Sequence, residues 1–162
     1  MATDVMNDTT PVETKQEKKK FFPAPEVESM AKQLIGKYHG FLREAKISYV
    51  FKDATWNKDG KPCAGEVKLM SPYVHVLTGF DFGVIINYKY WLQLDTKLRE
   101  AILDHLLSSC TADEDKEGNF KWKKAKPSVN EFPEVIERHG AYTEDLKNLD
   151  DALAEYNNKQ NG

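Results

Sequence analysis

The chain has 162 residues and a formal net charge of −3 at pH 7, with 40% hydrophobic and 30% charged residues. These values are ordinary for one soluble globular domain, and the small net charge excludes binding to nucleic acid or membrane through overall charge. No apolar stretch is long enough for a signal peptide or a membrane span, and Cys63 and Cys110 form no metal or disulfide pattern, so we expect a protein of the reducing cytoplasm.

The N-terminal part is predicted to be a disordered tail. Residues 1–24 are polar and carry three consecutive lysines just before Phe21 and Phe22. We expect these two aromatic side chains to dock on the folded part of the chain, where the tail ends. The folded part is predicted to be a single domain over residues 25–157, followed by a disordered end at residues 158–162.

A helix and three strands are predicted next. Pro25 suits the first helical position, and apolar residues at helical spacing predict a helix that ends near Ala45 or, because glycines weaken it, near Gly40. In the second strand, Val67 and Leu69 are expected to point inward, and the third strand is expected to be central and buried on both faces. The predicted strands are residues 46–52, 66–70 and 82–87.

The second half of the chain is predicted to be organised around one buried helix. Asp95 is a good N-cap for this helix, which is expected to end at Cys110 and is apolar on nearly all sides in its second half. A final amphipathic helix is capped by Thr143. Residues 71–79 fit a helical turn or an irregular crossover equally well. A short helix, a hairpin and a further helix are predicted at residues 88–94, 111–124 and 131–138. Strands followed by segregated helices indicate an α+β domain.

Three strings in this second half resemble a known protein family. DHLLSSC on the central helix, ADEDKEGNFKW after it and EFPEVIERHG further on are similar to stretches of the phage metallopeptidases, a zincin-like group. The resemblance extends from about residue 25 to about residue 149. It implies a minimal zincin-like α+β domain, with a small mixed sheet, a buried central helix and flanking helices. It also implies a protein of phage or prophage origin that works in the cytoplasm of the bacterial host.

The resemblance assigns roles to three positions on the central helix. The family's active helix carries His-Glu-x-x-His, so His105 stands at the first zinc ligand, Leu106 at the general-base glutamate and Ser109 at the second histidine. A leucine has no titratable group, and a serine hydroxyl is a poor zinc ligand. Cys110 lies roughly 140° around the helix from His105 and cannot replace Ser109. The catalytic site is therefore predicted to be degenerate.

The family's third zinc ligand is a histidine shortly before a Glu-Phe pair. Pro127 stands at that position, and proline binds no metal. Glu131 matches the family's glutamate and is, with His105, a weak metal candidate, but Ser128 and Glu131 also form a capping box, for which Asn130 is the alternative cap. We favour capping and predict that the zinc site is lost. We expect His105 to be a core histidine bonded to a carbonyl or a carboxylate.

Two further patterns lie in the predicted hairpin. Lysines interleave with Phe120 and Trp122, as on nucleic-acid-binding surfaces. These lysines are Lys121, Lys123, Lys124 and Lys126. Strand alternation would turn the aromatic side chains inward and leave the lysines solvated, so we favour packing over nucleic-acid contact. Asp113, Asp115 and Glu117 resemble the start of a calcium loop, but its last ligand position falls on Lys124, so we favour a solvated hairpin tip.

Three functions are compatible with these patterns. The one we favour is a catalytically inactive, metallopeptidase-like phage protein without a cofactor, which binds a host or phage protein and so modulates the host or its defence. The second is a metal-dependent peptidase with an unusual ligand set around His105 and Glu131. The third is a nucleic-acid-binding accessory protein that uses the lysines of residues 121–126. None of the three involves a membrane.

Overall fold

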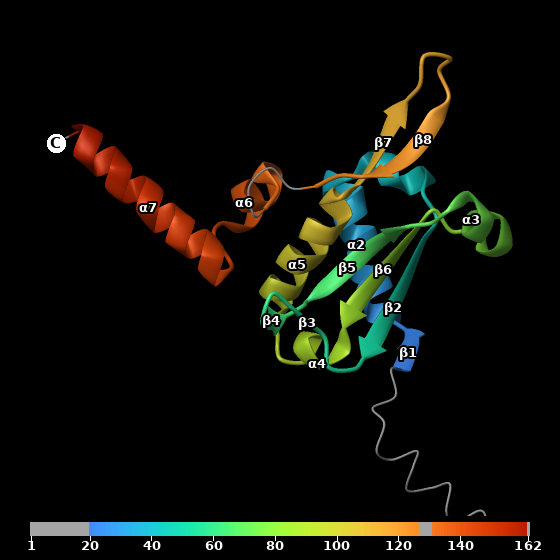
Figure 1. Ribbon diagram of the computed structural model, residues 1–162, viewed down its shortest axis with the longest axis horizontal. Helices are drawn as coiled ribbons and strands as arrows, with labels where there is room; N and C mark the ends of the chain where they lie inside the picture. The colour runs from blue at the N-terminus through green and yellow to red at the C-terminus, as the bar shows by residue number, and fades with distance from the viewer. Residues whose placement is uncertain (1–19, 127–130, 162) are drawn as a thin grey trace, which may run out of the picture.

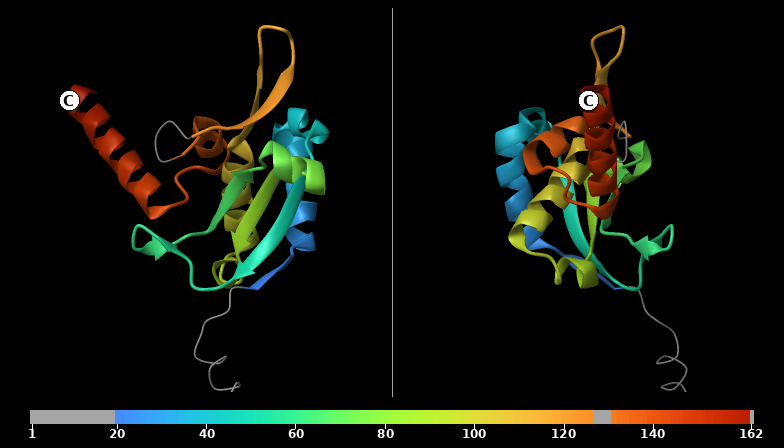
Figure 2. Two further views of the ribbon diagram at one scale, coloured as in Figure 1. Left: turned by 45° about the vertical axis from the view of Figure 1, so that its right-hand side comes forward. Right: turned by 90° about the vertical axis from the view of Figure 1, so that its left-hand side faces the viewer.

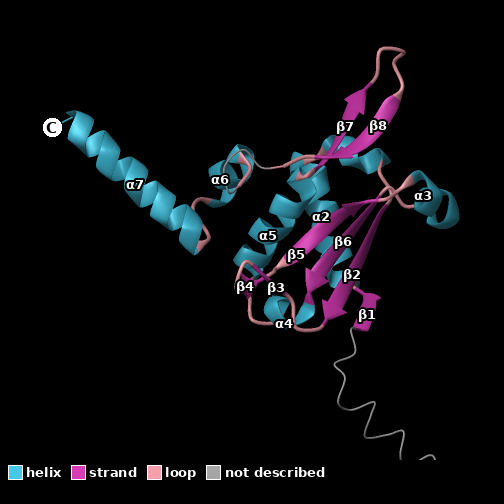
Figure 3. Ribbon diagram, in the orientation of Figure 1, coloured by secondary structure: helices cyan, strands magenta, loops and turns pink. Residues whose placement is uncertain are grey.

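The computed structural model describes residues 20–126 and 131–161. Within these residues the chain forms six α-helices, a four-stranded mixed sheet and two small hairpins, which confirms the predicted α+β class (Figure 1; Figure 3). The helices are α2 (Pro25–Tyr38), the 3-10 helix η1 (Gly40–Glu44), α3 (Pro72–Thr78), α4 (Tyr88–Trp91), α5 (Thr96–Ser108), α6 (Pro133–His139) and α7 (Glu144–Asn161). The sheet strands are β1 (Lys20–Pro23), β2 (Ile47–Asp53), β5 (Gly65–Leu69) and β6 (Phe82–Asn87), and the hairpins pair β3 (Asn57–Lys58) with β4 (Lys61–Pro62) and β7 (Cys110–Glu114) with β8 (Phe120–Lys124). None of the helices in these two described ranges combines the length and the apolar character that crossing a membrane requires.

The sheet is built around two parallel inner strands. Its order is β1-β2-β6-β5, in which β2 runs parallel to β6 and each edge strand is antiparallel to its neighbour. Strand β6 is an inner strand, as predicted, and Phe82, Val84 and Ile86 are fully buried on one of its faces. Burial of the opposite face is only partly confirmed, since Ile85 there is half-buried. The prediction for β5 is half wrong, since Val67 is buried but Leu69 is 41% exposed. Leu106 of the covering helix α5 lies beside Gly65, at the opposite end of this edge strand from Leu69.

The chain joins the sheet earlier than predicted. Part of the expected tail forms β1, which pairs antiparallel with β2, so the ordered part begins before Pro25. Phe22 packs against Phe51 and Tyr88, with ring centroids 5.5 and 4.9 Å apart. Phe21 is 56% exposed, because neighbouring side chains of a strand point to opposite faces. Docking is therefore confirmed for Phe22 and wrong for Phe21, and residues 1–19 of the predicted tail lie outside the described residues.

The structure decides two segments for which the sequence left alternatives open, and both form helices. Helix α2 ends at Tyr38, close to the earlier of its two predicted ends, and η1 follows it. Residues 71–79 form α3 with its caps, and Ser71 Oγ accepts a hydrogen bond from the backbone amide of Val74 at 3.2 Å. Gly79 ends α3 with a φ of 80°, a conformation that glycine adopts without strain.

Helix α5 lies at the centre of the core. Asp95 caps it as predicted, by accepting a hydrogen bond from the backbone amide of Leu98 at 2.9 Å. Leu103 and Leu107 are fully buried in the cluster that α5 forms with α2 and the sheet, and both helices cover the same face of the sheet (Figure 1; Figure 2). Cys110, expected to lie in this helix, is instead the first residue of β7.

The predicted hairpin β7–β8 forms, but only one of its two aromatic side chains packs inward. Trp122 lies against Phe82, with ring centroids 5.7 Å apart. Phe120 is 60% exposed and contacts Trp122 edge-on at 4.7 Å. The prediction that both rings turn inward is wrong for Phe120, because the tip of the hairpin projects beyond the sheet (Figure 1).

Helix α6 packs against α5, with Val135 fully buried, and only α7 leads the chain away from the core. Helix α6 begins at Pro133, after its predicted start at Glu131. Thr143 caps α7 as predicted, since its Oγ1 accepts a hydrogen bond from the backbone amide of Leu146 at 3.2 Å. Helix α7 includes residues that were expected to belong to the disordered end from residue 158 onward, and it extends away from the body (Figure 2).

Candidate functional site

A histidine, a glutamate and a tyrosine from different parts of the chain meet beside the second half of α5. Glu131, which precedes α6, is 2% exposed. Its Oε1 lies in hydrogen-bond contact with His105 Nδ1, and its Oε2 accepts a hydrogen bond from the hydroxyl of Tyr142. The backbone amide of Phe132 donates a further hydrogen bond to Oε1 at 2.8 Å. Burial and the neighbouring Glu131 carboxylate raise the pKa of Tyr142, so its phenol keeps its proton and acts as a donor.

A cavity of about 630 Å³ adjoins this group of residues. His105 lines it, and its side chain is 32% exposed. The apolar side chains of the lining are Pro62, Ala64, Tyr90, Leu94, Leu98, Ile102 and Leu106. The charged lining residues other than Glu131 are Lys61, Glu144, Asp145 and Lys147. An apolar wall with a few polar groups is the usual make-up of a binding site.

The contact with Glu131 determines which ring nitrogen of His105 carries the hydrogen. A carboxylate oxygen is an acceptor, so Nδ1 of His105 carries the hydrogen and donates it. In the neutral ring, Nε2 then holds a lone pair, and it has no hydrogen-bond partner among the described residues. His105 therefore presents an acceptor, or a base, to a group that enters the cavity.

The residues at the motif positions do not fit a zinc ion. Leu106 lines the cavity and has no donor atom, and Ser109 is buried with its hydroxyl donating to the backbone carbonyl of Leu106 at 2.6 Å. Pro127, at the position of the third ligand, lies outside the described residues. In the part of the chain that the structure describes, no three His, Cys, Asp or Glu side chains are grouped to hold a metal ion. One imidazole at the motif is fewer than the three protein ligands that catalytic zinc sites use.

Glu131 does not cap α6, contrary to the prediction. Phe132 occupies the capping position, and the Glu131 carboxylate contacts His105 and Tyr142 as well as the amide of Phe132. Ser128 and Asn130, the other residues of the predicted cap, lie outside the described residues. The physical reason is that α6 begins only at Pro133, so Glu131 precedes the helix, and its buried carboxylate takes the donors that lie around it: His105, Tyr142 and the amide of Phe132.

Replacing Tyr142 with Phe should lower the free energy of unfolding by about 1–3 kcal/mol, because the buried Glu131 carboxylate would lose a donor. Tyr73→Phe is the matched control, since that ring is 73% exposed, and its effect should stay within about 0.5 kcal/mol. Urea unfolding followed by tryptophan fluorescence measures both variants. Equal stability of the two would show that the Tyr142 hydroxyl does not hold Glu131.

A second buried polar cluster surrounds Asp104, the residue of α5 that precedes His105. Asp104 is fully buried and accepts hydrogen bonds from His39 Nε2 at 2.6 Å, His139 Nε2 at 3.0 Å and Arg138 Nη1 at 2.9 and 2.7 Å. Burial alone would raise the pKa of Asp104, but these hydrogen bonds and the Arg138 charge outweigh it and hold the pKa below its usual value. The ionised carboxylate therefore connects the end of α2, α5 and α6, and it fixes the helix that carries His105.

The other candidate residues of the sequence lie away from the cavity. The four hairpin lysines, Lys121, Lys123, Lys124 and Lys126, are exposed. Lys123 pairs with Asp113 at 3.2 Å across the hairpin. Asp115 Oδ1 accepts hydrogen bonds from the backbone amides of Glu117 and Asn119 at 2.9 and 2.8 Å, so this carboxylate closes the hairpin turn. Burial raises the pKa of Cys110 to about 12, which makes it an unreactive thiol.

Sequence reasoning missed Tyr142 and the cluster around Asp104. A signal for the cluster exists, since an acidic residue in the apolar half of a buried helix requires cationic or donor partners. Arg138 and His139, adjacent in sequence and near the end of a predicted helix, were candidates for that role. Tyr142 gives no such signal, because its contact with Glu131 depends on the path of the chain between α6 and α7.

Comparison with known proteins gives one match. A family model described as "Putative phage metallopeptidase" matches residues 19–154. The matched stretch includes α5, Glu131 and Tyr142, and thus every residue of the site beside the cavity. No curated protein and no solved structure matches the chain.

Proposed function

Since the chain belongs to the family of phage metallopeptidases, we propose that it is a zincin-like domain that binds a polypeptide without cleaving it. The polypeptide is a protein of the host or of the phage, and its binding modulates that protein. The observation that supports this most directly is the cavity beside His105, whose wall includes Leu106 where the family's motif has its general base.

An extended polypeptide can reach the cavity along the edge of the sheet. Strand β5 pairs with β6 on one side, and none of the described strands pairs with its other side. Gly65, its first residue, lines the cavity together with Ala64. The free backbone groups of a sheet edge pair readily with an added strand. A segment bound there would pass His105, whose Nε2 can accept a hydrogen bond, and would place a side chain on the apolar wall.

The groups needed for zinc-dependent hydrolysis are not at these positions. Such hydrolysis requires a metal to activate water and a carboxylate to remove its proton. Leu106 cannot act as a base, and the hydroxyl of Ser109 is engaged with a helix carbonyl. The two remaining side chains with atoms that could bind a metal, His105 and Glu131, are hydrogen-bonded to each other. This supports binding over catalysis.

A metal-dependent peptidase with an unusual ligand set is the second candidate. The observation that favours it is the carboxylate behind His105, because metal-binding histidines are commonly oriented by a carboxylate on their other nitrogen. In this arrangement His105 Nε2 would be the ligand and Glu131 its support. Both oxygens of Glu131 already accept hydrogen bonds, which disfavours Glu131 itself as a ligand.

Zinc content, peptide cleavage and peptide binding together distinguish the two candidates. After refolding with zinc and desalting, elemental analysis should give well under one zinc ion per chain. A fluorescein-labelled pool of random-sequence peptides should bind, as measured by anisotropy, and should stay intact by mass spectrometry. Leu106→Arg, which fills the cavity, should weaken binding at least about tenfold. Leu92→Arg is the matched control, because Leu92 is 56% exposed, and it should leave binding unchanged.

Two outcomes would contradict the proposal. One tightly held zinc ion per chain, lost together with peptide cleavage in His105→Ala, would establish the peptidase instead. Peptide binding that Leu106→Arg leaves unaffected would show that the cavity is not the binding site.

A further inference from the structure

Helix α7 carries an apolar stripe that the rest of the described chain leaves largely uncovered. Leu146, Leu149, Leu153 and Tyr156 lie three or four residues apart and share one face of the helix. Leu146 is buried, but Leu153 and Tyr156 are 53% and 60% exposed, and the helix extends away from the body (Figure 1; Figure 2). Most of a helix's stability in a protein comes from burying its apolar face. We therefore expect a partner surface to cover the stripe.

Helix α7 is also acidic, which restricts what can cover it. Its charged residues give a net charge of −3. They are Glu144, Asp145, Asp150, Asp151 and Glu155 against Lys147 and Lys159. Asp150 is exposed, lies about 40° around the helix from Leu146 and so flanks the stripe. Two such helices would repel each other, so a basic apolar surface suits α7 better than a second α7.

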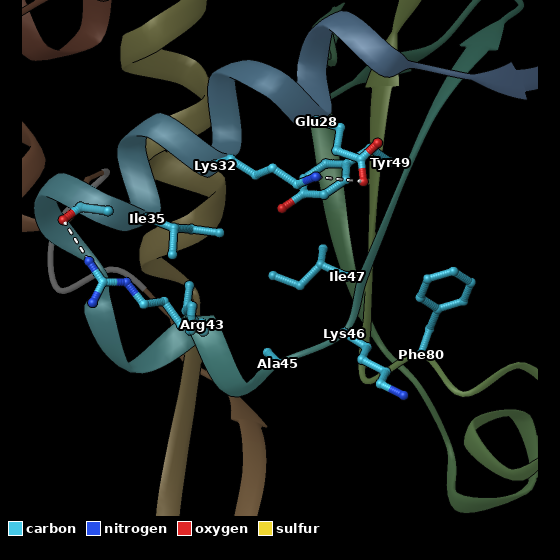
Figure 4. A pocket seen from close by; sticks show the side chains of 11 residues that line it. Glu28, Lys32, Ile35, Arg43, Ala45, Lys46, Ile47, Tyr49 and Phe80 are labelled. Carbon is cyan, nitrogen blue, oxygen red and sulfur yellow. Dashed lines mark hydrogen bonds and ion pairs between the residues drawn. The ribbon is translucent and has the colours of Figure 1, made fainter.

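A surface of this kind lies between α2, η1 and the beginning of β2 (Figure 4). It is a groove with a volume of about 450 Å³. Its apolar lining residues are Ile35, Leu42, Ala45, Ile47 and Phe80. Its charged lining residues are Lys32, Arg43 and Lys46, with Glu28 as the one acidic residue among them. An apolar lining flanked by excess positive charge is complementary to α7.

Two of the three cations of the groove, Arg43 and Lys46, have no ion-pair partner among the described residues. Lys32 pairs with Glu28 at 3.7 Å, which neutralises one of the three. The guanidinium of Arg43 makes only a long hydrogen bond, 3.4 Å, to the backbone carbonyl of Gly36. The ammonium of Lys46 has no partner among the described residues. Burial raises the pKa of Tyr49, so its hydroxyl adds no negative charge to the groove.

We propose that α7 of one copy docks in this groove on a second copy of the chain. The stripe would lie on the apolar lining, and Asp150 would face Arg43 and Lys46. Within one chain the two surfaces do not meet. The start of α7 lies beside β4, where Lys61 pairs with Asp145 at 3.1 Å, and α7 leaves the body on the side opposite α3 (Figure 1). The contact joins two different surfaces, so it builds a ring or an open chain. The groove shares no lining residue with the cavity beside His105.

Sedimentation velocity of the full chain, over a wide concentration range, tests this contact with two complementary variants. The wild type should form species larger than a dimer as its concentration rises, less so at high salt. Arg43→Glu reverses a charge of the groove, and Leu153→Arg places a charge in the apolar stripe of α7. Each change removes one side of the contact, so each variant alone should remain a monomer. An equimolar mixture should form a one-to-one dimer, because one copy still has its helix and the other its groove.

Charge reversal at the hairpin, Lys121→Glu, is the matched control and should assemble like the wild type. A wild type that stays monomeric at every concentration would overturn the proposal, as would assembly that persists in both variants. A mixture that remains monomeric while the wild type assembles would also overturn it, since the two copies would then meet through other surfaces.

Discussion

Asp104→Asn should lower the free energy of unfolding by about 3–5 kcal/mol, the largest expected effect of a conservative change in this protein. Asparagine keeps the shape of the side chain but removes its charge. The guanidinium of Arg138, only 19% exposed, would lose its counter-charge, and the hydrogen bonds from His39 and His139 would weaken. The packing of α5 between α2 and α6 depends on these bonds. Urea unfolding followed by circular dichroism measures the loss.

Asp113→Asn is the matched control, because Asp113 is 61% exposed in its pair with Lys123 and should change stability by less than about 1 kcal/mol.

The effect of Asp104→Asn should also depend on pH. Folding lowers the pKa of Asp104 below its usual 3.8, so its contribution is complete above about pH 4 and is lost as the pH falls through the folded-state pKa. The stability difference between wild type and variant should shrink in acid, and a difference that grows there would contradict this role of Asp104.

Leu107→Ala should cost about 2–5 kcal/mol, because Leu107 is fully buried in the cluster that joins α5 to the sheet. Leu106→Ala should fall at the lower end of that range, since Leu106 lines the cavity and its removal enlarges an existing space. Leu92→Ala is the exposed control and should stay within about 0.5 kcal/mol.

Thermal and urea unfolding of the three leucine variants provides the measurement. An unchanged stability in Leu107→Ala would mean that α5 is not the core helix. A larger loss for Leu106→Ala than for Leu107→Ala would mean that the cavity wall is packed more tightly than the structure shows.

The sequence by itself determined most elements and several of their ends. Asp95 and Thr143 cap their helices through hydrogen bonds to amides three residues on, and such contacts can be read from local spacing. The apolar run at residues 82–87 is an inner strand of the sheet, and a short continuous apolar run predicts such a position from the local sequence alone. Leu106 and Ser109 could be recognised on the motif because helical spacing fixes which side chains lie together.

Only the tertiary structure decided what the polar groups do and which apolar faces are covered. Asp104 is hydrogen-bonded to His39, 65 residues away in sequence. Glu131, predicted to cap a helix, instead forms a hydrogen bond with His105. Strand alternation indicated a face for Leu69 and for Phe120, but not whether another element covers it. The partners of a buried charge and the cover of an apolar face come from segments distant in sequence. Local spacing does not encode which of those segments packing brings together.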